Sequence, residues 1–450
     1  MQPAIDFMDL KATSIWTRPV YKRITRLGLE AFWIAVGQAV TVLGGLVGVR
    51  LLTNVLAPMA YGQLALGMTL ATLVQQVALG PLGGAFLRFF SPAEKDGQLA
   101  SYWQAIQVLL KQVTFILIGI IALVALGMWL VGYTNWLGLI LAAFTFALIS
   151  GYNSSMDRVQ NAARQRVIVA WHQALGQWLR FLIAVLLVGL LGAFSTVAML
   201  GYALASVIVL CSQYVFFRRK ILARIPARAK VNQSDVKDWT RQMWNYAWPF
   251  MTWGVFTWVQ IASDRWALEL FGTTSDVGLY AVLYQLGYYP LMLLSNFMVT
   301  FISPILFSQA GDGSNPIGLS RAHRLNGLVV LCSVMLTVVG TALGFLLHKQ
   351  VFSLLVAPQY RVVSALLPIM LMSGGLFASG QAASLLLLTE LNSQGLIAPK
   401  IATAVLGILL NICGAYWFGL RGVVYASVLF SLMYFLWVIL LARRRAACVV

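Results

Sequence analysis

Four polar side chains recur at helical spacing in an otherwise apolar stretch of the chain: Arg166, Gln173, Gln177 and Arg180. On an α-helix these positions share one face and form a polar ladder, which ends at Arg180 near the centre of the stretch. The fork of donors on a guanidinium matches the oxygens of a phosphate group, so the ladder is a candidate phosphate path. The alternative is a packed bundle in which a carbonyl or carboxylate neutralises Arg180.

Two further arginines, Arg50 and Arg265, come near the ends of long apolar segments. Each is a candidate substrate ligand, and each could instead extend its long side chain to a membrane interface. Arg265 could also pair with Glu269, four residues later. Asp264 is then left as a carboxylate at membrane depth, where it could carry a proton or bind a cation, and we take it as the candidate ion-coupling residue. A structural ion pair is the alternative for Asp264.

Tyrosines recur every four residues at Tyr280, Tyr284 and Tyr288. Aromatic faces with a hydroxyl suit sugar rings, so Tyr284 and Tyr288 are candidate sugar contacts. A tyrosine stripe in a membrane helix also serves packing or interfacial anchoring, and both interpretations stay open.

The composition indicates whether these segments are surrounded by water or by lipid. The chain of 450 residues is 60% hydrophobic and 10% charged, and apolar runs of about 20 residues recur along it. The runs lack the alternation of barrel strands, so we expect an all-α integral membrane protein. The net charge of +18 comes from basic residues in the connections, and it indicates membrane topology rather than binding to nucleic acid.

About twelve transmembrane helices are predicted, with starts between Leu29 and Gly422. Most of the 31 lysines and arginines fall in connections on one side, which predicts cytoplasmic N- and C-termini. Helix breakers interrupt several spans, notably Gly80-Pro81 and Pro290, and predict bends within those helices.

The polar stretch Arg218–Arg241 divides the chain nearly in half. We expect an N-lobe over residues 1–217 with a basic N-terminal segment, a cytoplasmic linker over 218–245, and a C-lobe over 246–450 with a basic tail. Each half opens similarly, with Arg50 ahead of Gly62 and Arg265 ahead of Gly278. This weak internal repeat, for which chance similarity is the alternative, predicts two six-helix lobes around a central cavity.

The sequence lacks the motifs of common enzyme classes. It contains no GxxxxGK[ST] loop, no HExxH and no large connection that could hold a catalytic domain, so we expect neither an enzyme nor a resident cofactor. The four cysteines have neither metal-site nor disulfide-framework spacing, and no metal site is expected.

Two stretches resemble a known family. Gly48–Leu66 is similar to the opening signature of the polysaccharide-biosynthesis flippases of the Wzx type, and Gly407–Asn411 with Gly419–Ala426 resembles a late part of it. That family belongs to the MOP superfamily, which also contains peptidoglycan-precursor flippases and MATE exporters. The resemblance implies two six-helix bundles in a V shape and a cationic central cavity for the pyrophosphate and glycan of an undecaprenyl-linked intermediate.

The resemblance also implies an activity and its setting. The chain is expected to flip an O-antigen, exopolysaccharide or capsule repeat unit from the cytoplasmic to the periplasmic leaflet of a bacterial inner membrane, with coupling to protons or sodium. Expected partners are membrane lipids and a polymerase, chain-length or glycosyltransferase protein. Two alternatives remain: a MATE-like ion-coupled drug or metabolite antiporter, and a non-transporting scaffold of envelope assembly.

Overall fold

The computed structural model describes residues 13–225, 231–310, 316–389 and 397–449, and all regular structure in these ranges is helical. The basic ends of the chain, before Trp33 and after Ala442, lie outside the described side chains, and residues 226–230 of the predicted linker lie outside the described residues.

The first half of the chain forms seven α-helices and three short turns. They are α1 (Thr13–Val55), α2 (Pro58–Val74), the π-helical turn η1 (Gln75–Leu79), α3 (Gly80–Lys95), α4 (Leu99–Val131), η2 (Thr134–Trp136), α5 (Leu137–Ala162), α6 (Arg166–Leu191), α7 (Ser195–Lys220) and η3 (Leu222–Arg224). Because α2, η1 and α3 are continuous, they make one pass, and this half contains six passes.

The second half repeats this plan. It contains α8 (Gln233–Phe271), α9 (Thr274–Leu283), the π-helical turn η4 (Tyr284–Tyr288), α10 (Tyr289–Ala310), α11 (Pro316–Leu355), η5 (Pro358–Leu366), α12 (Leu367–Thr389) and α13 (Ile397–Val449). The last helix is two passes, because Gly419 has φ 56° and ψ −137° and reverses the chain. The backbones of Gly414 and Gly422 then lie against each other on either side of the turn.

The described helices confirm the prediction of about twelve spans. Ten of them are long and apolar enough to cross a membrane, and one of these, Lys400–Ala442, holds the two passes joined at Gly419. Helix α8 is also long enough, although tryptophans and charged residues such as Asp264 lower its hydropathy. With α8, the part of the chain that the structure describes makes six passes in each half.

A π-helical turn lies ahead of the proline at two of the positions where bends were predicted, Pro81 and Pro290. A proline lacks an N–H donor, and its ring clashes with the carbonyl four residues earlier. The carbonyl four residues before Pro81 is that of Val77 in η1, and the one four residues before Pro290 is that of Leu286 in η4. An extra residue in the turn relieves this clash, which explains a π segment ahead of each proline.

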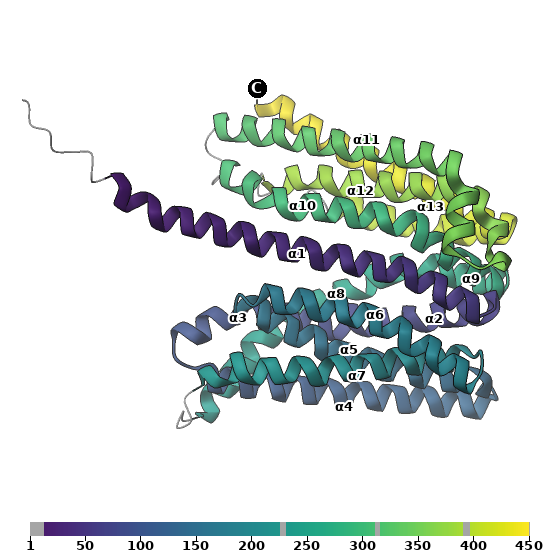
Figure 1. Ribbon diagram of the computed structural model, residues 1–450, viewed down its shortest axis with the longest axis horizontal. Coiled ribbons are helices and arrows are strands. Elements are labelled where there is room, and N and C mark those ends of the chain that lie inside the picture. The colour runs from purple at the N-terminus through teal and green to yellow at the C-terminus, as the bar shows by residue number, and fades with distance from the viewer. Residues whose placement is uncertain (1–12, 226–230, 311–315, 390–396, 450) are drawn as a thin grey trace, which may run out of the picture.

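The helices gather into two bundles with α1 running between them (Figure 1). Helix α1 packs on α6, and α10–α13 pack on one another in the second bundle. Helix α8 connects the bundles, because it packs against α13 and also against α3 and α4. The boundaries 1–217, 218–245 and 246–450 stay a prediction; α7 ends at Lys220 and α8 begins at Gln233, so helices enter the predicted linker from both sides.

The bundles meet closely where α2 crosses α9. A Cβ built on Gly62 would lie 1.9 Å from the Thr274 carbonyl oxygen, and one on Gly278 would lie 2.0 Å from the Pro58 carbonyl oxygen. The two glycines of the predicted repeat therefore face each other, and only glycine permits this approach. We call this end of the molecule the Gly62 end, and the opposite end, where α7 ends and α8 begins, the linker end.

Candidate substrate site

Arg180 is held by aromatic rings rather than by a carboxylate. Its guanidinium carbon lies 5.1 Å from the ring centre of Phe146 and 5.5 Å from that of Tyr202. Its Nε is buried and has no hydrogen-bond partner among the described residues. The same residues offer it no carboxylate within 4.0 Å, because the described ion pairs are Arg224–Glu94 and Arg265–Asp264. A buried charge without a counter-ion is costly, so this cation is available for an anionic ligand.

Three members of the polar ladder line one cavity of about 270 Å³ inside the N-lobe: Gln173, Gln177 and Arg180. Arg166, the fourth member, is exposed at the start of α6 and does not line this cavity. The ladder therefore leads from the exposed end of α6 to a polar cavity that contains the cation.

The cavity also contains groups that the sequence interpretation missed. Asp157 accepts hydrogen bonds from Gln173 (3.0 Å) and Gln213 (2.6 Å), and Gln213 also donates to Gln160 (3.0 Å). Three polar residues of α5, Asn153, Asp157 and Gln160, are spaced four and three apart and share a helical face, and the first two line the cavity. That spacing could have identified the α5 wall, whereas the contact with Gln213 on α7 has no local signal.

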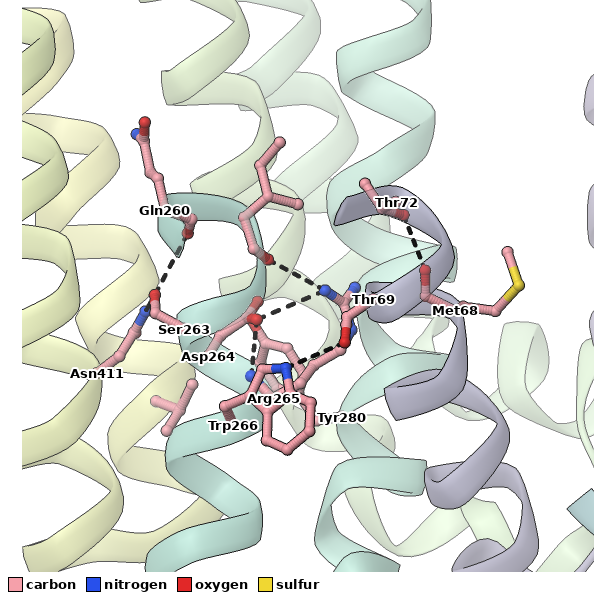
Figure 2. Close-up of polar contacts among 12 residues, drawn as sticks. Met68, Thr69, Thr72, Gln260, Ser263, Asp264, Arg265, Trp266, Tyr280 and Asn411 are labelled. Atoms are coloured by element: carbon pink, nitrogen blue, oxygen red, sulfur yellow. Dashed lines mark hydrogen bonds and ion pairs between the residues drawn. The ribbon is translucent and has the colours of Figure 1, made fainter. Parts of the chain in front are cut away.

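Asp264 and Arg265 form a second charged cluster, shown in Figure 2. The Asp264 carboxylate accepts from the Tyr280 hydroxyl (2.8 Å), from the Arg265 backbone N–H (2.7 Å) and from the Arg265 guanidinium (3.5 Å). Arg265 also lies over the Tyr284 ring at 4.7 Å. The structure thus pairs Arg265 with Asp264, while Glu269 accepts from the Thr274 hydroxyl (2.9 Å) instead.

The same segment of α8 holds the N-lobe through two tryptophans. The Trp258 indole N–H donates to the Thr69 carbonyl (2.7 Å), and the Trp266 indole N–H donates to the Thr69 hydroxyl (3.0 Å). Helix α8 therefore presents Asp264 to the C-lobe and its tryptophans to α2 of the N-lobe. A movement of α8 caused at Asp264 would therefore be transmitted to α2 of the N-lobe through these two hydrogen bonds.

The predicted tyrosines lie together in the C-lobe. The rings of Tyr284 and Tyr288 stack with centres 4.7 Å apart and planes 15° apart. Both line a cavity of about 780 Å³, which Asp264 and Tyr280 also line. The candidate sugar contacts and the candidate ion-coupling residue therefore share one cavity.

Arg50 lies in neither cavity but in the contact between the lobes. Its guanidinium donates to the Val356 carbonyl at the end of α11. Nearby, the Thr53 hydroxyl accepts from the Ala357 N–H (3.2 Å), and the Tyr360 hydroxyl donates to the Leu56 carbonyl (2.8 Å). These bonds join the end of α1 to the C-lobe, so Arg50 fastens the Gly62 end in this state.

The predicted residues thus fall into three groups: the N-lobe cavity, the C-lobe cavity and the contact at the Gly62 end. The Tyr61 hydroxyl of the N-lobe donates to the side-chain oxygen of Gln285 in the C-lobe (3.5 Å). Among the described residues, no three His, Cys, Asp or Glu side chains form a group that could hold a metal ion.

Comparisons with known proteins agree with this architecture. A family model described as "Polysaccharide biosynthesis protein" matches residues 27–309. No curated protein sequence matches the chain. The structure is similar to that of a lipid II flippase, MurJ, in an inward closed conformation, with a TM-score of 0.66 and 11% identity over 92% of this chain and 87% of that chain.

Transporters of the MOP superfamily share the fold as well. An inward-facing multidrug resistance MATE family transporter matches with a TM-score of 0.64 and 15% identity over 95% of this chain and 98% of that chain. A MOP superfamily transporter from Pyrococcus furiosus, whose binding pocket is described as having reverse polarity, matches with a TM-score of 0.55 and 13% identity over 95% of this chain and 96% of that chain. At these identities the likeness shows the fold alone.

Proposed function

We propose a function for this chain as a member of the polysaccharide biosynthesis protein family, to which it belongs because that family's model matches residues 27–309, more than half of its length. It is a multi-pass membrane protein with the fold of the MOP superfamily transporters. The proposed activity is the flipping of an undecaprenyl-pyrophosphate-linked oligosaccharide from the cytoplasmic to the periplasmic leaflet of a bacterial inner membrane. The oligosaccharide is the repeat unit of an O-antigen, exopolysaccharide or capsule.

The observation that carries this proposal is the unpaired Arg180. A substrate with a pyrophosphate needs a cation at membrane depth, and Arg180 has no carboxylate of its own among the described residues. The exposed Arg166 at the start of α6 offers an entry charge, and Gln177 offers an amide between the two arginines. Pyrophosphate oxygens would accept from these groups in place of water.

Movement across the membrane follows from the two bundles. The lobes are fastened at the Gly62 end by the α2–α9 crossing and by the bonds of Arg50, so substrate in this state would enter from the linker end. Opening the Gly62 end would release it on the other side, which is alternating access. We propose Asp264 as the residue that couples this change to a proton or sodium gradient, because it links Tyr280 of the C-lobe to the segment of α8 that holds Thr69.

A second candidate function, a MATE-like antiporter of cations, is favoured by one observation. Asp157 lines the N-lobe cavity and is bonded to amides of Gln173 and Gln213 rather than ion-paired within the described residues. A cationic substrate would find its counter-charge there, whereas an anionic one would find Arg180.

Transport by the purified protein tests the proposal. Proteoliposomes would receive a fluorescent undecaprenyl-pyrophosphate oligosaccharide, and an impermeant quencher would report how much of it stays in the inner leaflet. We expect the protein to move the lipid faster than protein-free liposomes do, and Arg180→Ala to slow it. Accumulation of a cationic dye without movement of the lipid would favour the antiporter instead.

A further inference from the structure

The larger cavity lies wholly within the C-lobe. It has a volume of about 780 Å³ and is enclosed by α8, α9 with η4, α12 and α13. Along the first pass of α13 its lining runs from Lys400 to Asn411, which is about 16 Å of helix at 1.5 Å per residue. A slot of this length and volume is large enough for a ligand of several rings.

One wall of the cavity is a continuous row of aromatic rings. Tyr284 stacks on Tyr288 at 4.7 Å, Tyr288 lies 6.1 Å from Phe377, and Phe377 stacks on Phe430 at 5.4 Å and lies 5.0 Å from Tyr434. Tyr284 has Tyr288 on one face and the Arg265 guanidinium on the other, so it offers its edge to a ligand. Aromatic side chains that line a cavity in this way provide apolar surface for ring ligands. Aromatic rings alone would bind any apolar ligand, so the polar groups of the cavity determine which class of ligand it selects.

The cavity also carries polar groups without partners. Gln260 on α8 and Gln381 on α12 line it, and neither side-chain amide has a hydrogen-bond partner in the described part of the chain. Asn411 donates to the Ser263 hydroxyl (3.0 Å), on the same side of α8 as Gln260 (Figure 2). An amide both donates and accepts, so Gln260 and Gln381 match hydroxyl groups, which also do both. Lys400 is the cavity's one cation among its lining residues.

The cavity is open on the side between α8 and α13. Helix α8 contacts α13 near the Gly62 end, where Phe271 meets Tyr416, but at the linker end it packs on the N-lobe, where Trp239 donates to Gln98 (2.9 Å). The space between α8 and α13 therefore widens toward the linker end. The cavity's exposed lining there is apolar, as in Phe256 and Val405, which are 62% and 53% exposed.

We propose that the C-lobe cavity binds the glycan of the substrate, with the aromatic side chains of its wall against the apolar parts of the sugar rings and Gln260 and Gln381 on their hydroxyl groups. The inference rests on the proposed function, and it divides the substrate between the lobes. The phosphates lie at Arg180 in the N-lobe, and the sugars lie in the C-lobe.

Binding of two lipids by the purified protein tests this division. The probes are undecaprenyl pyrophosphate without sugar and undecaprenyl pyrophosphate carrying a short chain of neutral hexoses. We expect the sugars to strengthen binding to the unaltered protein. The double substitution Gln260→Ala with Gln381→Ala should weaken binding of the sugar-bearing lipid about tenfold and leave the affinity for the bare lipid unchanged. Ala404→Trp, which fills the cavity from α13, should have the same selective effect, and Gln350→Ala, an exposed glutamine, should have none.

The outcomes separate the inference from the function on which it rests. Arg180→Gln should weaken both lipids equally, because both carry the pyrophosphate. If the unaltered protein binds neither lipid, the proposed function fails. If it binds both lipids, and the cavity variants leave the difference between them unchanged, the function stands and the glycan site is refuted.

Discussion

Replacing Gly62 by alanine tests how the lobes are fastened. The added Cβ would lie 1.9 Å from the Thr274 carbonyl oxygen, and real Cβ atoms essentially never approach closer than 3.0 Å, so α2 and α9 must separate by at least 1.1 Å. Overpacking of this kind costs about 1–3 kcal/mol. The cost applies only while the Gly62 end is closed, so the ratio of open to closed molecules should rise roughly 5- to 150-fold.

Distances between spin labels would measure this shift. With the four native cysteines replaced, labels at Met59→Cys and Val362→Cys would report the opening, because both positions are exposed near the Gly62 end and lie on different lobes. We expect Gly62→Ala to add a population with a longer distance. Gly84→Ala is the control in the same pass, because a Cβ there meets nothing within 4 Å. Identical distance distributions for the two variants would refute the close crossing as the fastening of the lobes.

Three further substitutions test the other contacts. Arg50→Gln removes a charged hydrogen bond between the lobes, so it should lower the free energy of opening by about 1.5 kcal/mol and the same labels should show a larger open population. An unchanged distance distribution would count against Arg50 as a fastening of the Gly62 end. Thr69→Val removes the partner of the partly buried Trp266 N–H and should lower the free energy of unfolding by about 1 kcal/mol in detergent, whereas Thr72→Val, which loses only a bond within its own helix, should cost less. Asp264→Asn should leave lipid flipping insensitive to imposed proton or sodium gradients; retained sensitivity would exclude Asp264 as the coupling residue.

The sequence was most informative about features with a local physical cause. Apolar length predicted the passes, Pro81 and Pro290 marked the places that the π-helical turns η1 and η4 precede, and the repeat at Gly62 and Gly278 marked two helices that cross at those glycines. Each of these follows from backbone chemistry within a few residues. The structure therefore agrees with the sequence most closely in the fold.

The contacts of the candidate site were harder to predict from the sequence because they join distant segments of the chain. Spacing along one helix suggested Glu269 as a partner of Arg265, but Tyr280 on another helix bonds Asp264 and holds it beside that arginine. The polar lining of the N-lobe cavity likewise depends on Gln213, which reaches Asp157 across 56 residues of sequence. Hydrophobic periodicity carries no information on such pairs.

The position of Arg50 shows a similar limit. Its place near the end of an apolar run is equally consistent with a cavity, an interface or a lobe contact, since a long side chain reaches all three. The Val356 carbonyl that it binds lies 306 residues later in the chain. Only the arrangement of the two lobes distinguishes these possibilities.

The central claim is that Arg180 carries the phosphates of a lipid-linked glycan, and flipping rates in liposomes test it most directly. Loss of a charged hydrogen bond to phosphate, about 1.5–3 kcal/mol, predicts that Arg180→Gln slows flipping roughly 10- to 100-fold. Arg180→Lys should retain part of the rate because it keeps the charge without the fork. Arg219→Gln, which removes an exposed arginine at the linker end, should flip the lipid at the unaltered rate. Equal rates for Arg180→Gln and Arg219→Gln would contradict the account.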